Sequence, residues 1–212
     1  IGKRFYNRYT DTRYDPFESC SVSNCNFTSK DEDVTKADAV LFHLAQTVEV
    51  PSKVPRQPGQ IWVWLSDESP NAVFQMSGDN DFSHYKGYFN WSMTYRMDSD
   101  VPVPYGRTIP LSADETPDDD QFYKNKSKNI ALLASHCSGQ NSRYVYLHEL
   151  QKFIEIDVFG KCGKVNACPG HYKKNCDVIK DYKIYVAFEN NNCDDYLTEK
   201  VSINQMTFDN LC

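Results

Sequence analysis

The sequence predicts an α/β fold in two lobes, and three observations lead to that prediction. Short apolar runs bounded by turn residues occur in the first half of the chain, which is typical of buried strands. An acidic, proline-containing stretch follows and gives way to lysines, as in a solvated linker. Residues 130–160 then show strand, helix and strand patterns in turn, which indicates a βαβ unit with a parallel sheet. We therefore expect lobes at residues 1–110 and 129–212, joined by a linker at residues 111–128.

Two apolar runs in the first lobe have the length and composition of buried strands. They span residues 39–44 and residues 60–65, and the second run leaves a Pro58-Gly59 turn. In open α/β sheets, ligands bind just beyond the carboxyl ends of the strands. Glu68 comes shortly after the second run. Its carboxylate is therefore well placed for chemistry.

The second lobe begins with the βαβ unit. Residues 130–134 predict a strand, residues 135–142 a polar loop, residues 143–154 a helix and residues 154–160 a second strand. The loop that enters the helix presents free backbone N–H groups and the positive end of the helix dipole. An anion site is therefore expected at this loop.

A further strand and helix are expected near the end of the chain. Residues 183–188 are apolar and of strand length, and a polar loop follows them. The helix should begin near Asp195 or Tyr196, because Asp195 can cap the first N–H groups while Thr198 and Glu199 fall in the first turn.

Charge and hydropathy exclude several classes of protein. The 212 residues include 23 Lys and Arg against 29 Asp and Glu, a net charge of −6, without a sustained basic stripe. Nucleic acids and anionic membrane surfaces are therefore not expected as partners, because both require basic groups to neutralise phosphate. No apolar run approaches the roughly 18 to 20 residues that span a bilayer. The chain begins at Ile1, so we expect that a targeting segment has been removed or that the chain is a fragment.

Cysteines and glycosylation sequons together indicate the secretory pathway. Sequons occur at Asn26, Asn90 and Asn125, and such triplets are acceptors only inside that pathway. The cysteine spacings are irregular and do not fit a zinc site, so disulfides are favoured over metal, with reduced cytosolic thiols as the alternative. The pairing stays open, because eight cysteines allow 105 connectivities. The eight are Cys20, Cys25, Cys137, Cys162, Cys168, Cys176, Cys193 and Cys212.

Two long motifs, in the same order, carry a resemblance to a known family. Residues 89–106, FNWSMTYRMDSDVPVPYG, resemble the FNWTxxYRxDSDxxxPYG signature of the α1,3-fucosyltransferases of glycosyltransferase family 10. Residues 185–190 and 195–200, YVAFEN and DYLTEK, resemble that family's FYLAFEN…DYITEK donor motif. The resemblance covers residues 19–204. Weaker matches lie at Trp64–Pro70 (W-x-x-x-ESP), Ser135–Arg143 (SNC…R) and His148–Gly160, and the Cys162–Cys193 cluster is similar to the invertebrate and core-type branch.

The resemblance implies a fold, a reaction and a location. The fold would be GT-B, with an acceptor lobe followed by a Rossmann-like donor lobe. The reaction would move fucose from GDP-fucose, with inversion, to a GlcNAc of glycoprotein N-glycans. The location would be the Golgi lumen, in a type II membrane protein whose N-terminal anchor helix is absent here. A GT-B lobe uses protein cations in place of a DxD-bound metal, so no essential metal is implied and a divalent cation is expected at most to stimulate.

The resemblance also assigns roles to individual residues. Glu68 would be the base that deprotonates the acceptor hydroxyl, rather than a surface glutamate. Arg143 and Lys200 would stabilise the departing diphosphate, although each alone would read as a solvated charge. Tyr196 and Glu199 resemble the contacts to the nucleoside and its ribose. Asn190 would hold the same loop in place.

Other residues of the signature have less certain roles. For Tyr95, Arg96, Asp98 and Asp100, an ion-pair network around the arginine is preferred over direct sugar contact. The tryptophans at 62, 64 and 91 could stack on acceptor sugars, but Trp62 and Trp64 share one face of a strand and are equally expected in the core. The five histidines show no spacing typical of metal ligands.

The sequence departs from the family after Lys200. The family continues through a further strand and glycine turn, whereas this chain ends with residues 205–212, so we expect an incomplete donor lobe. Three functions stay open: a fucosyltransferase, a catalytically inactive homologue that binds glycans or a lumenal partner, and an unrelated secreted interaction domain. The last does not explain two ordered motifs. No motif distinguishes a core GlcNAc acceptor from an antennary one. The cysteine cluster slightly favours core, by analogy with the core-type branch.

Overall fold

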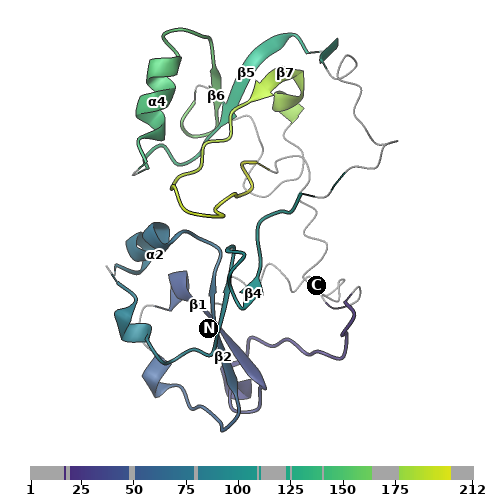
Figure 1. Ribbon diagram of the computed structural model, residues 1–212, viewed down its shortest axis with the longest axis vertical. Coiled ribbons are helices and arrows are strands. Elements are labelled where there is room, and N and C mark those ends of the chain that lie inside the picture. The colour runs from purple at the N-terminus through teal and green to yellow at the C-terminus, as the bar shows by residue number, and fades with distance from the viewer. Residues whose placement is uncertain are drawn as a thin grey trace. The chain divides into compact units, whose positions relative to one another are not determined.

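The computed structural model describes residues 17, 20–47, 51–78, 81–108, 110, 123–124, 126–139, 141–163 and 177–201. These residues form two compact units, each with its own parallel sheet (Figure 1). Unit 1 contains the described residues up to Pro104 and the segment Cys193–Asp195. Unit 2 contains Tyr105–Asn192 and the described residues from Tyr196 onward. The α/β class predicted from sequence is confirmed.

Unit 1 is built on a four-stranded parallel sheet in the order β1-β2-β3-β4. Its strands are β1 (Ala39–His43), β2 (Ile61–Ser66), β3 (Trp91–Thr94) and β4 (Val101–Pro102). In the ladder, Ala39 pairs with Ile61 and Val63 pairs with Trp91. The two predicted strands are thus confirmed to within one residue. β3 and β4 lie inside the signature at residues 89–106, where no strand was predicted.

One helix covers part of the unit 1 sheet. α2 (Pro70–Ser77) follows Ser69, whose hydroxyl accepts from the backbone N of Ala72 at 3.3 Å, and proline begins its first turn. The helix buries Val73 against Leu44 and Tyr85. It ends at Gly78, whose φ of 72° is the left-handed conformation that glycine adopts without strain. α2 was not predicted, because its eight residues make little more than two turns, too short to show a clear helical period.

Unit 2 confirms the predicted βαβ unit. Strand β5 (Lys128–Leu133) lies between β6 (Asp157–Phe159) and β7 (Tyr182–Tyr185), and both pairings are parallel. Helix α4 (Arg143–Leu150) lies over one face of this sheet (Figure 1) and buries Leu147 in a core with Ile130, Leu132 and Ile156. The helix ends at Leu150 instead of the predicted Ile154. Phe153, beyond its end, is 86% exposed, so apolar residues there do not extend the buried face.

The predicted helix near Asp195 is wrong. Asp195 has a φ of 60° and lies in a turn, and the residues from Tyr196 to Thr198 are not helical. The backbone N–H of Thr198 donates to the Glu189 side chain, a partner distant in sequence. A single turn then forms, in which the N–H of Val201 donates to the carbonyl of Thr198. The carboxylate that caps the start of this turn is therefore that of Glu189 and not that of Asp195.

Several smaller features complete the described structure. Short 3-10 helices span Asp31–Asp33, Leu44–Gln46, Pro51–Lys53, Ser83–Tyr85 and Asp177–Asp181. Most of the predicted linker at 111–128 lies outside the described residues, and its last residue, Lys128, belongs to β5. Among the described residues, none of the helices has the length and apolarity needed to cross a bilayer.

Candidate functional site

Glu68 lies where the sequence analysis expected it, just beyond the carboxyl end of β2. It is half-buried in the short connection between β2 and α2. The Ser66 hydroxyl donates to the main-chain oxygen of Glu68 at 3.0 Å, and the next residue, Ser69, caps α2. The backbone of Glu68 is therefore fixed on both sides, which limits where its carboxylate can reach.

A histidine that sequence reasoning missed lies beside this connection. His43, the last residue of β1, is 9% exposed, and its Nε2 lies 3.1 Å from Oδ1 of Asp67. Adjacent parallel strands end at the same edge of a sheet, so β1 and β2 bring these two residues together. The pair joins the end of β1 to the residue that precedes Glu68.

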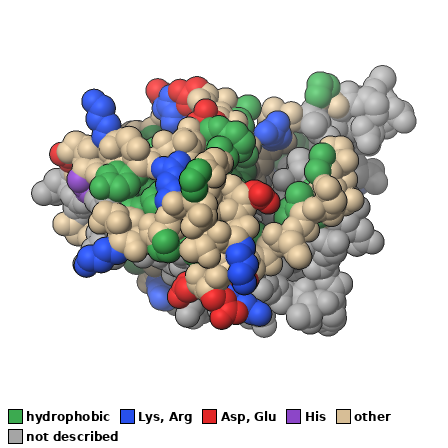
Figure 2. All heavy atoms as spheres, turned by 90° about the horizontal axis from the view of Figure 1, so that it is seen from below, with side chains coloured by type: hydrophobic (Ala, Val, Ile, Leu, Met, Phe, Trp, Pro, Cys, Tyr) green, Lys and Arg blue, Asp and Glu red, His purple; other side chains and the backbone are tan. Residues whose placement is uncertain are grey.

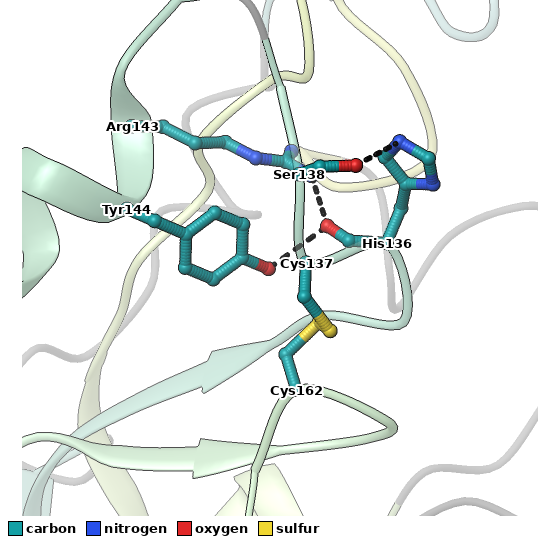
Figure 3. Close-up of a disulfide and its surroundings, with 6 residues drawn as sticks. All are labelled: His136, Cys137, Ser138, Arg143, Tyr144 and Cys162. Atoms are coloured by element: carbon teal, nitrogen blue, oxygen red, sulfur yellow. Dashed lines mark hydrogen bonds between the residues drawn. A yellow bond between two sulfur atoms is a disulfide. The ribbon is translucent and has the colours of Figure 1, made fainter.

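Arg143, at the start of α4, is held by main-chain oxygens on two loops. It is 9% exposed and donates through Nη2 to His136 at 2.6 Å and through Nη1 to Phe188 at 2.9 Å. Figure 3 shows its side chain reaching from α4 toward the loop at His136. Arg143 thus lies in unit 2 at the start of the helix, as expected. Its two hydrogen bonds connect the loop after β5 with the segment after β7.

The loop after β5 is also fixed by a disulfide. Cys137 is bonded to Cys162, which follows β6 (Figure 3). On the other side, the Tyr144 hydroxyl donates to the His136 carbonyl at 3.0 Å. The predicted presence of disulfides is confirmed by this bond. Cys25 and Cys193 are unbonded and exposed, so the predicted cysteine set is not fully paired.

Asn141 forms a second connection between the same two loops. Its Nδ2 donates to the Glu189 carbonyl at 2.8 Å and to Oδ1 of Asn192 at 2.9 Å. Asn190 is half-buried nearby, and its carbonyl would lie 3.4 Å from a Cβ placed on Gly139. Asn190 therefore lies in the fixed loop, as expected, while the residue that binds the loop is Asn141.

The Glu189 carboxylate is the centre of a hydrogen-bonded cluster around Lys200. It accepts from the backbone N of Thr198 at 2.7 Å and lies 2.8 Å from the Thr198 hydroxyl. Its Oε2 lies 3.2 Å from Nζ of Lys200. Lys200 also contacts the Thr198 hydroxyl at 2.8 Å and Glu199 at 3.0 Å. Thus Lys200, predicted as a donor-binding cation, is paired with two carboxylates.

Arg143 and Lys200 line one small recess in unit 2. Its volume is about 10 Å³, room for about one water molecule, and Tyr185 also lines it. Within the described part of the chain, Nε of Arg143 and the Tyr185 hydroxyl are buried without a hydrogen-bond partner. Burial, followed by the nearby Glu199 charge, raises the pKa of Tyr185 above its ordinary value, which keeps the phenol neutral. Arg143 and Lys200, the two predicted cations, therefore line a recess in which Nε of Arg143 and the Tyr185 hydroxyl have no hydrogen-bond partner.

The two remaining residues of the predicted nucleotide contact differ in exposure. Tyr196 is 4% exposed, and its ring packs edge-on against Tyr105 with centroids 6.4 Å apart. The Glu199 side chain is 53% exposed. Glu199 is therefore open to solvent in this structure, whereas Tyr196 is part of the packing of unit 2.

The residues of the DSD motif form a local polar network in unit 1. Arg96 binds Asp98 with two hydrogen bonds of 2.7 and 2.6 Å, and these bonds hold the pKa of the Asp98 carboxyl below its ordinary value. Asp100 accepts from the backbone N and the hydroxyl of Ser92, both at 2.8 Å. Tyr95 is 3% exposed. Its burial raises the pKa of its phenol to about 12, and the charge and hydrogen bond of the neighbouring Cys193 side chain act in the same direction. Arg96 thus forms an ion pair with Asp98, the arrangement that the sequence analysis preferred over direct sugar contact.

The tryptophans and sequons occupy distinct environments. Trp62 is buried in the unit 1 core, whereas Trp91 is 46% exposed. The side-chain oxygen of Asn90 accepts from the backbone N of Trp62 at 2.8 Å and so extends the β2–β3 pairing. Asn26 is exposed. Asn125 lies outside the described residues.

Charges on the described surface are mixed. On the face shown in Figure 2, Lys and Arg side chains lie among Asp and Glu side chains instead of gathering in one patch. Among the described residues, no three His, Cys, Asp or Glu side chains are grouped closely enough to hold a metal ion.

Two family comparisons cover most of the chain. Residues 4–106 match the family described as "Fucosyltransferase, N-terminal". Residues 123–211 match "Glycosyltransferase family 10 (fucosyltransferase) C-term". The first match contains Glu68 and the Arg96 network, and the second contains Arg143, Glu189 and Lys200.

Individual relatives give the same result. The chain is 38% identical to the α-(1,3)-fucosyltransferase fut-6 of Caenorhabditis elegans, over 83% of the chain and 46% of that protein. It is 32% identical to α-(1,3)-fucosyltransferase 7 of Rattus norvegicus, over 92% and 50%. It is 33% identical to the human 4-galactosyl-N-acetylglucosaminide 3-α-L-fucosyltransferase FUT6, over 85% and 48%. The chain spans about half the length of these curated relatives.

Proposed function

Because the chain belongs to the fucosyltransferases of glycosyltransferase family 10, we propose that it takes part in α1,3-fucosyl transfer from GDP-fucose to a GlcNAc of glycoprotein N-glycans. The observation that carries the proposal is the joining of two loops in unit 2. There, Arg143 and Lys200 line one recess, and these are the two residues to which the family resemblance assigns the departing diphosphate. The human relative is named for an N-acetylglucosaminide acceptor, which supports GlcNAc as the acceptor sugar here.

Unit 2 is the proposed donor lobe of a GT-B fold, and unit 1 the proposed acceptor lobe. In unit 2, the loop after β5 and the segment after β7 both leave the carboxyl ends of parallel strands, where nucleotides bind in open α/β sheets. Arg143 and Lys200 would bind the diphosphate as protein cations, without an essential metal. Glu199, which is exposed, would accept hydrogen bonds from hydroxyl groups of the bound nucleotide sugar.

Glu68 is the proposed general base in unit 1. Its carboxylate would take the proton from the acceptor hydroxyl as the oxygen of that hydroxyl forms a bond to the anomeric carbon of fucose. On the opposite face of the sugar, the bond from the anomeric carbon to the phosphate oxygen would break, and GDP would leave with the electron pair. The configuration at the anomeric carbon is inverted by this single displacement.

The proposed setting is the Golgi lumen, in a type II membrane protein. The Cys137–Cys162 disulfide supports an oxidising compartment, and the exposed Asn26 sequon is accessible for glycosylation there.

A transfer assay with a matched pair of variants tests this function. The folded, disulfide-bonded chain is incubated with GDP-fucose and a GlcNAc-terminated N-glycopeptide, and the product is weighed by mass spectrometry. We expect a gain of one fucose, lost in Glu68→Gln and kept in Glu32→Gln, which alters an exposed glutamate of the same unit. GDP-fucose binding without transfer by the wild type would instead favour an inactive, glycan-binding homologue. Absence of both binding and transfer would contradict the proposal.

A further inference from the structure

Glu189 is a nearly buried carboxylate to which the sequence analysis assigned no role. Its side chain is 11% exposed. A buried charge is costly unless hydrogen bonds and an opposite charge compensate for it. The backbone N and hydroxyl of Thr198 and the ammonium of Lys200 provide this compensation. The carboxylate is therefore fixed in one place, at the exit of β7.

Three side-chain oxygens surround the ammonium group of Lys200. It donates hydrogen bonds to the Thr198 hydroxyl at 2.8 Å and to Glu199 at 3.0 Å, and it forms an ion pair with Glu189 at 3.2 Å. Thr198 is itself 1% exposed, so this acceptor cannot move without disturbing the packing. Lys200 is thus held by two partners with little exposure, the buried Thr198 and the nearly buried Glu189.

The third partner of Lys200 differs from the other two. The Glu199 side chain is 53% exposed, against 11% for Glu189. An exposed ion pair contributes little to stability and is easily exchanged. An incoming anion can therefore replace Glu199 as the partner of Lys200, while Glu189 and Thr198 keep the ammonium in place.

We propose that Glu189 is a positioning residue that holds the Lys200 ammonium at the recess it shares with Arg143, ready for an oxygen of the donor diphosphate. This inference rests on the proposed function, because it requires that unit 2 binds GDP. Glu189 acts through Lys200 and does not touch the ligand. The energetic benefit is preorganisation, since a lysine side chain loses several rotatable bonds when it is ordered.

Glu189→Gln changes this arrangement with little change in shape. The amide oxygen can still accept from the backbone N of Thr198, but the amide NH2 then faces the hydroxyl of Thr198 or the ammonium of Lys200. An ammonium has no acceptor to offer, so Lys200 loses its fixed position. We expect the Kd for GDP to rise about tenfold, the loss expected when a hydrogen bond to a charged group is removed.

A double-mutant cycle separates positioning from a merely structural role. GDP binding is measured by titration calorimetry in the full chain for wild type, Glu189→Gln, Lys200→Met and the double variant. If Glu189 acts through Lys200, all three variants lose about tenfold, because the effects are not additive. Glu149→Gln is the matched control, since it alters an exposed ion pair to Lys152 in the same unit, and its Kd should equal that of wild type.

Three outcomes overturn the inference in different ways. Wild-type affinity in a folded Glu189→Gln protein excludes positioning by Glu189. A loss of about a hundredfold in the double variant would mean that the two residues act independently. If the wild type does not bind GDP, the proposed function itself is contradicted. The wild-type titration alone shows this outcome, so it is distinguishable from the other two. If Glu189→Gln does not fold, the same cycle with Thr198→Val decides, because that variant removes only the hydroxyl between Glu189 and Lys200.

Discussion

Arg143 binds two main-chain carbonyls through two different nitrogens of its planar guanidinium fork, whereas a lysine at this position would offer one nitrogen on a differently shaped side chain. We expect Arg143→Lys to lower the free energy of unfolding by about 1–3 kcal/mol, because one of two half-buried hydrogen bonds from a charged donor is lost. Urea denaturation measures the change. The control is Lys152→Ala, which removes an exposed ion pair to Glu149 and should cost about 0.5 kcal/mol or less. Equal unfolding midpoints for the two variants would show that the fork contributes nothing.

Tyr182 predicts a stability change in alkaline solution. Its burial, followed by its 2.5 Å hydrogen bond to Asp157, raises its pKa from 10.0 to about 12. The phenol therefore stabilises the folded state fully below pH 10, and this contribution disappears as the pH rises from 10 to about 12. Denaturation of wild type and Tyr182→Phe at several pH values tests this. The difference in unfolding free energy should shrink over that interval, and a constant difference would refute the assignment.

The residues predicted from sequence are those whose neighbours along the chain identify them. Glu68 follows a strand, and Arg143 begins a helix, so local patterns placed both correctly. His43 and Asn141 were missed because their partners, Asp67 and Asn192, come from other segments, which the folded sheets bring together. Glu189 was missed because the irregular chain after β7 folds back to place Thr198 beside it. Sequence therefore predicts where candidate residues lie more readily than what holds them there.

The same limit applies to the elements. Strands β1, β2 and β5 were predicted because buried parallel strands are continuous apolar runs. β3 was not predicted. Part of its pairing with β2 comes from the side-chain oxygen of Asn90, which takes the place of a backbone carbonyl, and a sequence pattern does not show such a contact. The helix expected at Asp195 failed for a related reason, since the Glu189 carboxylate binds the free N–H group that a helix cap would bind.

Gly160 ends β6 in a conformation that only glycine tolerates there. Its φ is 89°, and a Cβ at this position would overlap the Ala134 carbonyl at the end of β5. Gly78, at the end of α2, has a φ of 72° with open space around it. Gly160→Ala should therefore destabilise the protein by more than Gly78→Ala, whose cost is about 1 kcal/mol of backbone strain. Thermal unfolding compares the two, and equal losses would show that the overlap relaxes freely.

At the scale of the whole molecule, each unit places its candidate residues at the carboxyl ends of parallel strands. In unit 1 these are His43 at the end of β1 and Glu68 after β2. In unit 2 they are the loop at 134–142 after β5 and the segment at 186–192 after β7. One topological rule thus accounts for both sets. The proposed division of chemistry between the units rests on their residues: the Glu68 carboxylate in unit 1 and the Arg143 and Lys200 cations in unit 2.

This division predicts that GDP acts on one unit. Ligand at one hundred times its Kd stabilises the state that binds it by about 2.7 kcal/mol, so amide hydrogen exchange should slow where the ligand orders the chain. We expect protection within residues 135–143 and 186–201, because these segments are joined around the recess that Arg143 and Lys200 line. Exchange in β1 and β2 should not change.

Arg143→Lys provides the control for that experiment. The variant keeps the charge but cannot bind both loops, so GDP should protect the two segments less than in wild type, at the same fraction of protein bound. Protection centred on residues 61–69 would place the nucleotide in unit 1 and reverse the proposed roles of the units. Equal protection in both units would contradict the prediction that GDP acts on one unit.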